Sequence, residues 1–316
     1  MSTAELPRVL VVAGPTATGK TRLGIELARR YGGEIVSADS MQVYRGMDIG
    51  TAKASSEERA AAPHHMLDVA EPWEDYSVSR YVEEAGRCCD EILSRGRLPI
   101  LVGGTGLYID SLLAQRDFAQ KDSCGDSLRE DLNAEYDRIG GEVMLSQLAA
   151  FDPDRAARLH PADKRRIVRA IEIYRLTGVT ITEHDAQTRA RPPRYRAARI
   201  VLSYRDRTAL YARIDRRVDA MIEAGLFDEV EKLLARGLSA DCTAMQAIGY
   251  KEAALALRGE LSREAAAELI KQNSRRYAKR QLTWFKRTPD ALWICWDGEP
   301  DFDRALREVQ QHFQLG

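Results

Sequence analysis

The stretch Gly14-Pro15-Thr16-Ala17-Thr18-Gly19-Lys20-Thr21 decides the fold. It matches the phosphate-binding pattern G-x-x-x-x-G-K-[ST], with the apolar run 9–13 before it and helical spacing over 20–30 after it. In such a loop, backbone N–H groups surround phosphate oxygens, and the helix N-terminus adds about half a positive charge. Lys20 would neutralise the terminal phosphate, and the Thr21 hydroxyl would ligate Mg²⁺. The motif therefore predicts a di- or triphosphate ligand without specifying ATP.

Three short β-type runs each end in a stretch typical of a ligand site. Residues 9–13 lead into the loop above, 34–38 lead into Asp39, and 99–102 lead into Gly103-Gly104-Thr105-Gly106. The strand–helix–strand spacing of the first two predicts a βαβ unit, and hence an α/β fold with a doubly wound parallel sheet of the P-loop class. Ligands of such sheets bind beyond the carboxyl ends of the strands, so one site can use all three loops.

The 316 residues correspond to about two domains by length alone. From about residue 112 to 190 the pattern is helical and poor in strands, whereas 200–204 and 292–296 again favour strands. The sequence thus predicts a catalytic core formed by residues 1–114 and 197–316. A helical insertion over 115–196 interrupts this core.

The composition excludes several classes of protein. Apolar residues make up 44% and charged residues 30%, which is typical of a folded chain rather than a disordered one. Five cysteines without C-x-x-C spacing favour neither a disulfide framework nor a zinc site, and no apolar run is long enough to span a bilayer. His64 and His65 would point apart on a strand, so they predict no metal pair. We expect an intracellular protein without membrane segments.

Asp39 ends the second predicted strand on the ligand side of the sheet. Its carboxylate could hold Mg²⁺ through water, cap a helix or act as a general base, and the position alone favours the cap or metal role. No other apolar strand ends in an Asp that could serve as a Walker-B residue, because 99–102 ends in Gly103. This absence argues against an ordinary ATPase.

A predicted helix over 209–223 has Thr208 as its expected N-cap and Gly225 as its stop signal. Arg213 and Arg217 lie four residues apart and therefore side by side on it. A pair of surface arginines is the plainer interpretation, and an arginine clamp on phosphate is the functional one.

Two regions are strongly basic although the whole chain has a net charge of -1. Residues 155–199 contain twelve Lys and Arg against four Asp and Glu, and 271–287 contain seven basic residues and no acidic one. The second region also contains Tyr277, Trp284 and Phe285. Such a helix is often a solvated face over a core stripe, but two of them favour contact with nucleic-acid phosphates.

Several motifs in order along the chain resemble one family. Besides the phosphate-binding loop they are Asp39-Ser40-Met41-Gln42-Val43-Tyr44-Arg45-Gly46-Met47-Asp48-Ile49-Gly50-Thr51-Ala52-Lys53, Pro63-His64-His65, Gly103-Gly104-Thr105-Gly106-Leu107-Tyr108, His160-Pro161 with Asp163 to Arg169, and Lys279-Arg280-Gln281-Leu282-Thr283-Trp284. Together they resemble the bacterial tRNA dimethylallyltransferases, also called tRNA isopentenyltransferases. The likeness spans essentially the whole chain, and its most specific block is 39–53. Ala54 replaces a frequent Pro, which affects no catalytic residue.

The resemblance implies transfer of a dimethylallyl group from dimethylallyl diphosphate to N6 of the adenosine 3′ of the anticodon, tRNA position 37. The diphosphate would be held by the loop residues Gly14 to Thr21, by Mg²⁺ on Thr21, and from the far side by Arg217 with Arg213. Asp39 would be the general base, and Thr16 would lie near the reacting carbon. The catalytic residues implied are Asp39, Thr16, Lys20 and Arg217. Apart from the resemblance, we expect a monomer located in the cytoplasm.

The same resemblance implies contacts with the anticodon stem-loop of tRNA. The adenine must be flipped out of its stack to be reached. The implied contacts to tRNA are Asp39, Ser40, Met41, Gln42, Thr105, Asp163, Lys164, Arg165, Arg166, Ile167, Lys279 and Arg280. The insertion would then be the tRNA-binding domain.

Three alternatives stay open at this point. A P-loop small-molecule kinase would use Asp39 as the base for a phosphoryl acceptor, and an adenylate isopentenyltransferase would prenylate a free nucleotide. An RNA-binding P-loop protein would bind ATP or another nucleotide only as a switch. The two basic regions favour tRNA over the substrates of the kinase and of the adenylate isopentenyltransferase. Ligand choice would distinguish the nucleotide switch, because dimethylallyl diphosphate needs no adenine pocket beside the phosphate loop.

Overall fold

A computed structural model of the chain describes residues 6–114, 124–288 and 290–314. The chain forms two compact units. The core unit consists of Met1–Leu113 and Arg194–Gly316, and the insertion unit is Ala114–Pro193.

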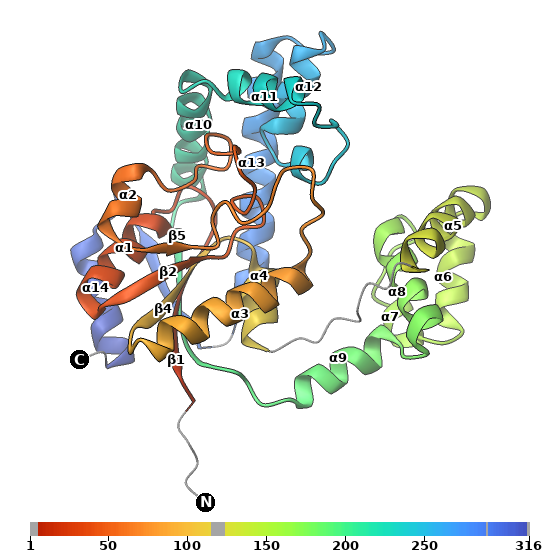
Figure 1. The fold of residues 1–316 in the computed structure, drawn as a ribbon, viewed down its shortest axis with the longest axis horizontal. Coiled ribbons are helices and arrows are strands. Elements are labelled where there is room, and N and C mark those ends of the chain that lie inside the picture. The colour runs from red at the N-terminus through yellow and green to blue at the C-terminus, as the bar shows by residue number, and fades with distance from the viewer. Residues whose placement is uncertain (1–5, 115–123, 289, 315–316) are drawn as a thin grey trace, which may run out of the picture. The chain divides into compact units, whose positions relative to one another are not determined.

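The core unit is built on one parallel sheet of six strands (Figure 1). The strands are β1 (Arg8–Ala13), β2 (Gly33–Ser37), β3 (His64–His65), β4 (Leu98–Gly103), β5 (Arg196–Tyr204) and β6 (Leu292–Trp296). Their order is β3-β2-β4-β1-β5-β6, and every neighbouring pair is parallel. The predicted α/β class with a parallel P-loop sheet is confirmed. The two-residue strand β3 was not predicted, because two residues are too short to form a pattern.

Strand β1 lies inside the sheet and is covered on both faces. Val9 and Val11 belong to one cluster of buried apolar side chains, whereas Leu10 and Val12 belong to the other. Successive residues of a strand point to opposite faces, so a continuous apolar run is what a doubly covered strand requires. The loop after β1 therefore starts from a fixed, central position.

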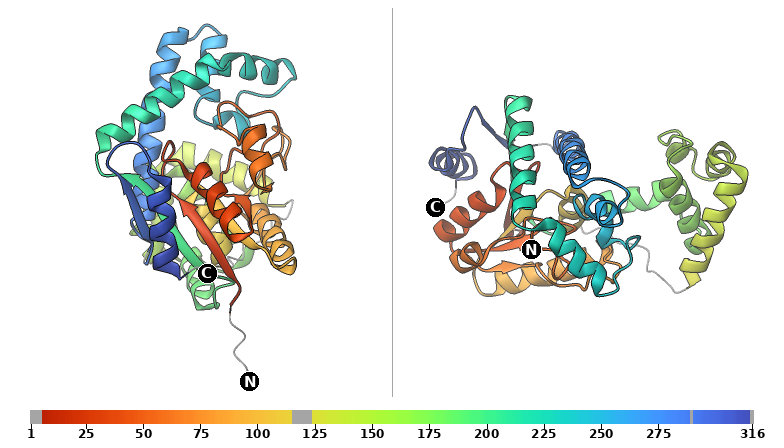
Figure 2. Two further views of the ribbon diagram at one scale, coloured as in Figure 1. Left: turned by 90° about the vertical axis from the view of Figure 1, so that its left-hand side faces the viewer. Right: turned by 90° about the horizontal axis from the view of Figure 1, so that it is seen from above.

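Helices of the core unit cover both faces of the sheet. They are α1 (Lys20–Tyr31), α2 (Ser56–Ala61), α3 (Val78–Ser94), α4 (Gly106–Leu113), α10 (Arg207–Glu223), α11 (Leu226–Ala235), α12 (Tyr250–Leu257), α13 (Arg263–Phe285) and α14 (Phe302–Phe313), with a short 3₁₀ turn at Ala244–Gln246. Apolar side chains of α1 and α14 pack into one cluster, and those of α3 and α4 pack into the other. Figure 2 (left) shows α1 in red and α14 in dark blue on the same face.

The start of α10 corrects the predicted cap. Asp206, not Thr208, is the N-cap residue, because its carboxylate accepts hydrogen bonds from the N–H groups of Thr208 (2.9 Å) and Ala209 (3.3 Å). Asp206 and Thr208 are both residue types that commonly cap helices, but only Asp206 is placed to accept hydrogen bonds from the free N–H groups of the first turn.

The insertion unit is a bundle of helices with its own small core. Its elements are α5 (Cys124–Ile139), α6 (Gly141–Ala149), α7 (Pro153–Ala156), α8 (Lys164–Thr177) and α9 (Ile181–Ala190). Leu132, Met144, Leu148 and Ile171 are among the side chains that fill the core. Glu172 is completely buried and pairs with Arg129 (2.8 Å) and Arg169 (2.9 Å). Part of the basic charge of this unit therefore balances an internal carboxylate.

Across the described ranges, no helix combines the length and the apolar character needed to cross a lipid bilayer.

Candidate active site

A cavity of about 1020 Å³ lies in the core unit, at the carboxyl ends of β1, β2 and β4. The phosphate-loop, Asp39 and Gly103-Gly104 segments all contribute to its wall, together with α10 and α13. Figure 1 shows α10 and α13 beyond the edge of the sheet where these strands end. The predicted residues that line it are Thr16, Ala17, Gly19, Lys20, Thr21, Asp39, Ser40, Met41, Gln42, Arg213, Arg217 and Arg280. The structure thus brings the three predicted loops into one site.

The remaining predicted residues have different surroundings. Thr18 is buried beneath the loop, and its hydroxyl donates a hydrogen bond to the Pro15 carbonyl (2.8 Å). Gly14 has φ of +138°, and a Cβ there would lie 2.3 Å from the Leu202 carbonyl oxygen, so only glycine fits. Lys279 is exposed and lies outside the cavity wall. Residues 163–167 belong to the insertion unit.

Lys20 lies in the first turn of α1, and its ammonium group donates to the Pro15 carbonyl oxygen at 2.7 Å. Burial, and next the nearby charge of Arg217, lower the pKa of Lys20 to about 7, against the opposing effect of Asp39. Burial also lowers the pKa of Arg217, while Asp39 and Glu58 oppose the shift. Two cations thus lie close together in a place poor in water, where a polyanion would stabilise both of them.

The two predicted clamp arginines differ in their partners. Arg213 forms an ion pair with Glu299 (2.7 Å) and lies over the Tyr204 ring (5.7 Å). The Arg217 guanidinium makes no hydrogen bond or ion pair with any residue in the described part of the chain. Arg217 is therefore available to an incoming anion, whereas one nitrogen of the Arg213 guanidinium is already engaged by Glu299.

The Asp39 loop has a fixed local structure. Asp39 Oδ1 accepts a hydrogen bond from the Met41 N–H (2.9 Å), which engages one of its two carboxylate oxygens. Thr105 is not part of the cavity wall, but its hydroxyl accepts the Ser40 N–H at 3.0 Å. The loop after β4 thereby holds the loop after β2.

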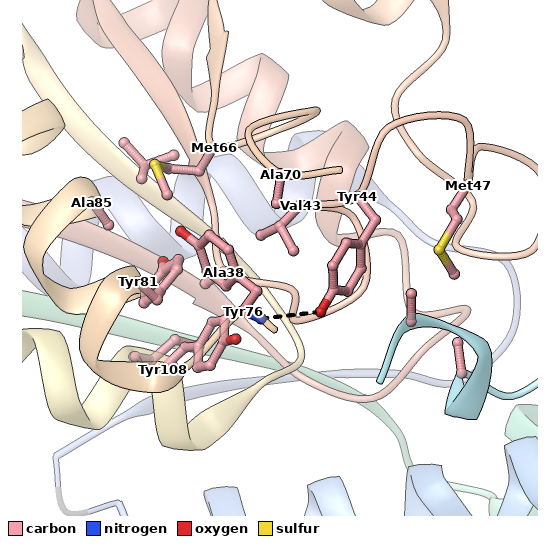
Figure 3. Close-up of a cluster of buried hydrophobic side chains, with 14 of the residues drawn as sticks. Ala38, Val43, Tyr44, Met47, Met66, Ala70, Tyr76, Tyr81, Ala85 and Tyr108 are labelled. Atoms are coloured by element: carbon pink, nitrogen blue, oxygen red, sulfur yellow. Dashed lines mark hydrogen bonds between the residues drawn. The ribbon is translucent and has the colours of Figure 1, made fainter. Parts of the chain in front are cut away.

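Buried aromatic side chains pack against the residues on either side of this loop, Ala38 and Val43 (Figure 3). Tyr44 is fully buried just beyond the Asp39 turn, and its hydroxyl accepts the Tyr76 N–H (3.4 Å). Tyr81 stacks on Tyr108 with ring centroids 4.1 Å apart and donates to the Ser37 carbonyl (3.1 Å). Rigid packing of this kind fixes where Asp39 enters the cavity.

Gln42, a predicted tRNA contact, is engaged within the chain. Its carbonyl oxygen accepts from the Ser37 hydroxyl (3.0 Å), and its NH₂ group donates to the carbonyls of Thr51 (3.1 Å) and Ala52 (3.3 Å). These bonds shape the wall of the cavity formed by residues 50–54. Gln42 thus has a structural task besides any contact with a substrate.

The same wall depends on a residue that the sequence analysis missed. The Glu229 carboxylate accepts hydrogen bonds from the N–H groups of Asp48 (3.0 Å), Ile49 (2.9 Å) and Gly50 (3.3 Å), and from the Tyr250 hydroxyl. An acidic residue on an amphipathic helix has no sequence signal that distinguishes this role from an exposed position.

Gln281 was also missed as a site residue, although it lies within one of the quoted motifs. Its side chain joins the phosphate loop to the loop after β4, with contacts to the Thr16 N–H and the Gly104 carbonyl.

The predicted contact between Ile167 and tRNA stays a prediction. The Ile167 side chain is completely buried in the core of the insertion unit, where it packs against neighbouring helices. Arg165 and Arg166, on the same turn of α8, are exposed.

The comparison with known proteins identifies the family. A family model described as IPP transferase matches residues 42–288, and a second one, isopentenyl transferase, matches residues 7–68. The chain belongs to the tRNA dimethylallyltransferase family. It is 44% identical over 307 residues to the tRNA dimethylallyltransferase of Acetivibrio thermocellus, covering 97% of each chain. It is 47% identical over 301 residues to that of an Exiguobacterium species, covering 95% of this chain and 94% of the relative.

Solved structures of the family agree with this assignment. The tRNA isopentenylpyrophosphate transferase of Bacillus halodurans has a TM-score of 0.69 and 41% identity, and the alignment covers 98% of each chain. A eukaryotic dimethylallyltransferase described as acting on tRNA has a TM-score of 0.78 and 30% identity, over 97% of this chain and 77% of that one. The predicted membership of the tRNA dimethylallyltransferase family and the predicted prenyltransferase class are confirmed.

Proposed function

We propose that this protein transfers the dimethylallyl group of dimethylallyl diphosphate to N6 of the adenosine 3′ of a tRNA anticodon. The observation that carries the proposal is one cavity with a phosphate loop, two partly desolvated cations and a carboxylate at the end of a neighbouring strand. The family assignment supports the prenyl transfer, and the neighbour described as acting on tRNA supports the RNA substrate.

The diphosphate is the leaving group of this reaction. The allylic C–O bond breaks, and the electron pair goes to the diphosphate oxygen. Loop N–H groups at the start of α1, together with Lys20 and Arg217, would stabilise that charge. The lowered pKa of Lys20 supports the assignment, because the negative ligand would restore the protonated form of a cation that burial disfavours.

The side chains of the cavity fit a magnesium ion. In the described part of the chain no three Asp, Glu, His or Cys side chains are grouped to hold a metal. Mg²⁺ commonly keeps several waters and takes one or two protein oxygens besides substrate phosphates. The Thr21 hydroxyl lines the cavity next to Lys20 and would hold the ion together with the diphosphate. The ion would neutralise the charge of the leaving group.

The nucleophile is an exocyclic amine conjugated to a purine ring, and such an amine must lose a proton as its nitrogen bonds to the allylic carbon. Asp39 would accept that proton, since its carboxylate lines the cavity and one of its oxygens is positioned by the Met41 N–H. Thr16 lies on the phosphate loop in the same wall, where its hydroxyl would lie near the reacting carbon. The adenosine would enter the cavity flipped out of its stack.

The tRNA would contact residues of both units. Ser40, Met41 and Arg280 line the cavity, and Lys279 is exposed on α13. In the insertion unit the proposed contacts are Lys164, Arg165 and Arg166, with Asp163 at the start of the same helix. The monomeric state and the cytoplasmic location stay predictions.

Mass analysis of nucleosides tests the proposal. Unmodified tRNA is incubated with the protein, Mg²⁺ and dimethylallyl diphosphate, and then digested to nucleosides. We expect one adenosine to gain a dimethylallyl group, at the position 3′ of the anticodon. Parallel reactions with AMP or ADP in place of tRNA test the adenylate isopentenyltransferase alternative, and ATP with no prenyl donor tests the kinase. Prenylated free nucleotide with unmodified tRNA would overturn the proposal.

A further inference from the structure

Gln281 is a polar side chain buried between two of the loops that form the cavity. It lies on α13 with 5% of its surface exposed. Its Oε1 accepts the N–H of Thr16 (3.2 Å), and its Nε2 donates to the carbonyl oxygen of Gly104 (2.9 Å). These partners lie 265 and 177 residues away along the chain. One amide thus joins the loop after β1 to the loop after β4.

The fit around this amide is tight. A Cβ on Gly104 would lie 2.1 Å from Gln281 Nε2, so the glycine lets the backbone approach the side chain. The next residue, Thr105, accepts the Ser40 N–H. A chain of contacts therefore runs from Thr16 through Gln281 and Gly104–Thr105 to the turn that begins with Asp39.

Both ends of this chain of contacts carry groups of the proposed reaction. The phosphate loop would hold the electrophile, and Asp39 would take the proton of the nucleophile. Reaction requires the two substrates in near-attack geometry, where a misplacement of about 1 Å costs on the order of 100-fold in rate. The distance between the two loops would therefore affect the rate, and the Gln281 amide is hydrogen-bonded to both of them.

Helix α13 adds a reason why a glutamine side chain has this role. Tyr277 and Arg280 on the same helix also line the cavity. The amide has both a donor and an acceptor, which the Thr16 N–H and the Gly104 carbonyl require at once. No other uncharged side chain of this length offers both.

We propose that Gln281 is a positioning residue that holds the phosphate loop in register with the Asp39–Thr105 side of the site. The inference rests on the proposed prenyl transfer. Gln281 acts through Thr16 and Gly104, and its effect is expected on turnover rather than on the affinity for either substrate.

Two variants separate its hydrogen bonds from its volume. Gln281→Met keeps the length and the packing but removes both hydrogen bonds. Gln281→Glu keeps an acceptor for the Thr16 N–H but turns a carboxylate oxygen toward the Gly104 carbonyl. The control is Gln272→Met, because Gln272 is an exposed residue of the same helix. We expect kcat to fall about 100-fold in Gln281→Met and at least as much in Gln281→Glu. The control should match the wild type.

The measurements are kcat and KM for both substrates, the Kd for inorganic pyrophosphate, and the melting temperature. A positioning role lowers kcat while both KM values and the pyrophosphate Kd change little. Wild-type kcat in Gln281→Met would overturn the inference, as would a loss confined to KM. If the wild type itself forms no prenylated tRNA, the proposed function fails, which is a separate outcome.

Hydrogen exchange of the wild-type protein keeps the inference testable even if the variants do not fold. The Thr16 amide should be protected, because its N–H donates a hydrogen bond to the buried side chain of Gln281. If the Thr16 amide of the folded wild type exchanges as fast as an exposed loop amide, the hydrogen bond between Thr16 and Gln281 is absent and the inference is wrong.

Discussion

The cations of the cavity and those at the start of α8 carry the same formal charge in different surroundings. Lys20 and Arg217 are partly withdrawn from water, and burial lowers the pKa of each. Arg165 and Arg166 are exposed, and Arg166 has only a 3.9 Å ion pair with Asp163. Lys20 and Arg217 suit a compact anion, because such an anion can replace the water that these two cations have lost. Arg165 and Arg166 suit a long polyanion bound mainly by release of counterions.

This contrast predicts that substitutions in the two regions will impair different properties of the protein. Changes in the cavity should affect the chemical step or the binding of diphosphate, with little dependence on salt. Changes on α8 should affect tRNA affinity alone, with strong dependence on salt, because exposed charges are screened over about 8–10 Å at moderate ionic strength.

The largest effect is expected for Asp39→Asn, which leaves the cations of both regions in place. The amide keeps the shape and one hydrogen bond but cannot accept the proton, so kcat should fall about 10²–10⁴-fold. Since the charge of Asp39 raises the pKa of Lys20, the pyrophosphate Kd is best compared at pH 6, where Lys20 is protonated in the wild type. Lost pyrophosphate affinity with intact kcat would make Asp39 a metal residue instead.

Lys20→Ala removes a desolvated cation, and we expect it to cause the next largest loss of turnover. One electrostatic contact to the developing charge is typically worth about 10²–10³ in rate. Pyrophosphate binding should weaken as well, whereas tRNA affinity should stay at the wild-type value at every salt concentration. Turnover close to that of the wild type would remove Lys20 from the phosphate site.

The pH dependence of pyrophosphate binding is a smaller and sharper test. Free Lys20 has a pKa lowered to about 7, and a bound anion must raise it. Binding therefore takes up a proton above pH 7, and affinity should fall by up to about tenfold per pH unit as the pH rises from there. Lys20→Arg is the control, because its guanidinium stays charged while the ligand titrates identically in both proteins. Equal pH profiles for the two proteins would mean that Lys20 is already protonated in the free enzyme.

Local patterns predicted the frame of the site, and long-range pairings account for what was missed. The phosphate loop and the Asp39 position follow from a strand, a turn and a helix within a few residues of each other. Gln281 and Glu229 act through partners far away along the chain, so their neighbours in sequence carry no trace of the role. The same holds for the ion pair between Arg213 and Glu299.

The burial of the Ile167 side chain could have been predicted from the sequence pattern. The motif from Asp163 to Arg169 suggests a single tRNA-binding block, but a helix turns its residues to different faces. Ile167, Val168 and Ile171 have the spacing of a buried stripe, and all three are buried. The helical period separates the exposed Arg165 and Arg166 from the residues that pack the core.

The smallest effect is expected for the combined change Lys164→Ala, Arg165→Ala and Arg166→Ala on α8. Lys164 already pairs with Asp137 (2.6 Å), so its removal frees a carboxylate that also repels phosphate. Affinity for tRNA should fall, and the plot of log affinity against log salt should flatten by about one unit for each phosphate that the protein no longer neutralises. Pyrophosphate binding should not change, because these residues lie outside the core unit.

The control is Arg29→Ala with Arg30→Ala, which removes exposed cations at the end of α1 remote from the phosphate loop. If the plots for the wild type and the triple variant coincide over several salt concentrations, the basic residues of α8 do not bind tRNA. They would then only keep the surface of the insertion unit solvated, and the predicted difference between the two groups of cations would be wrong.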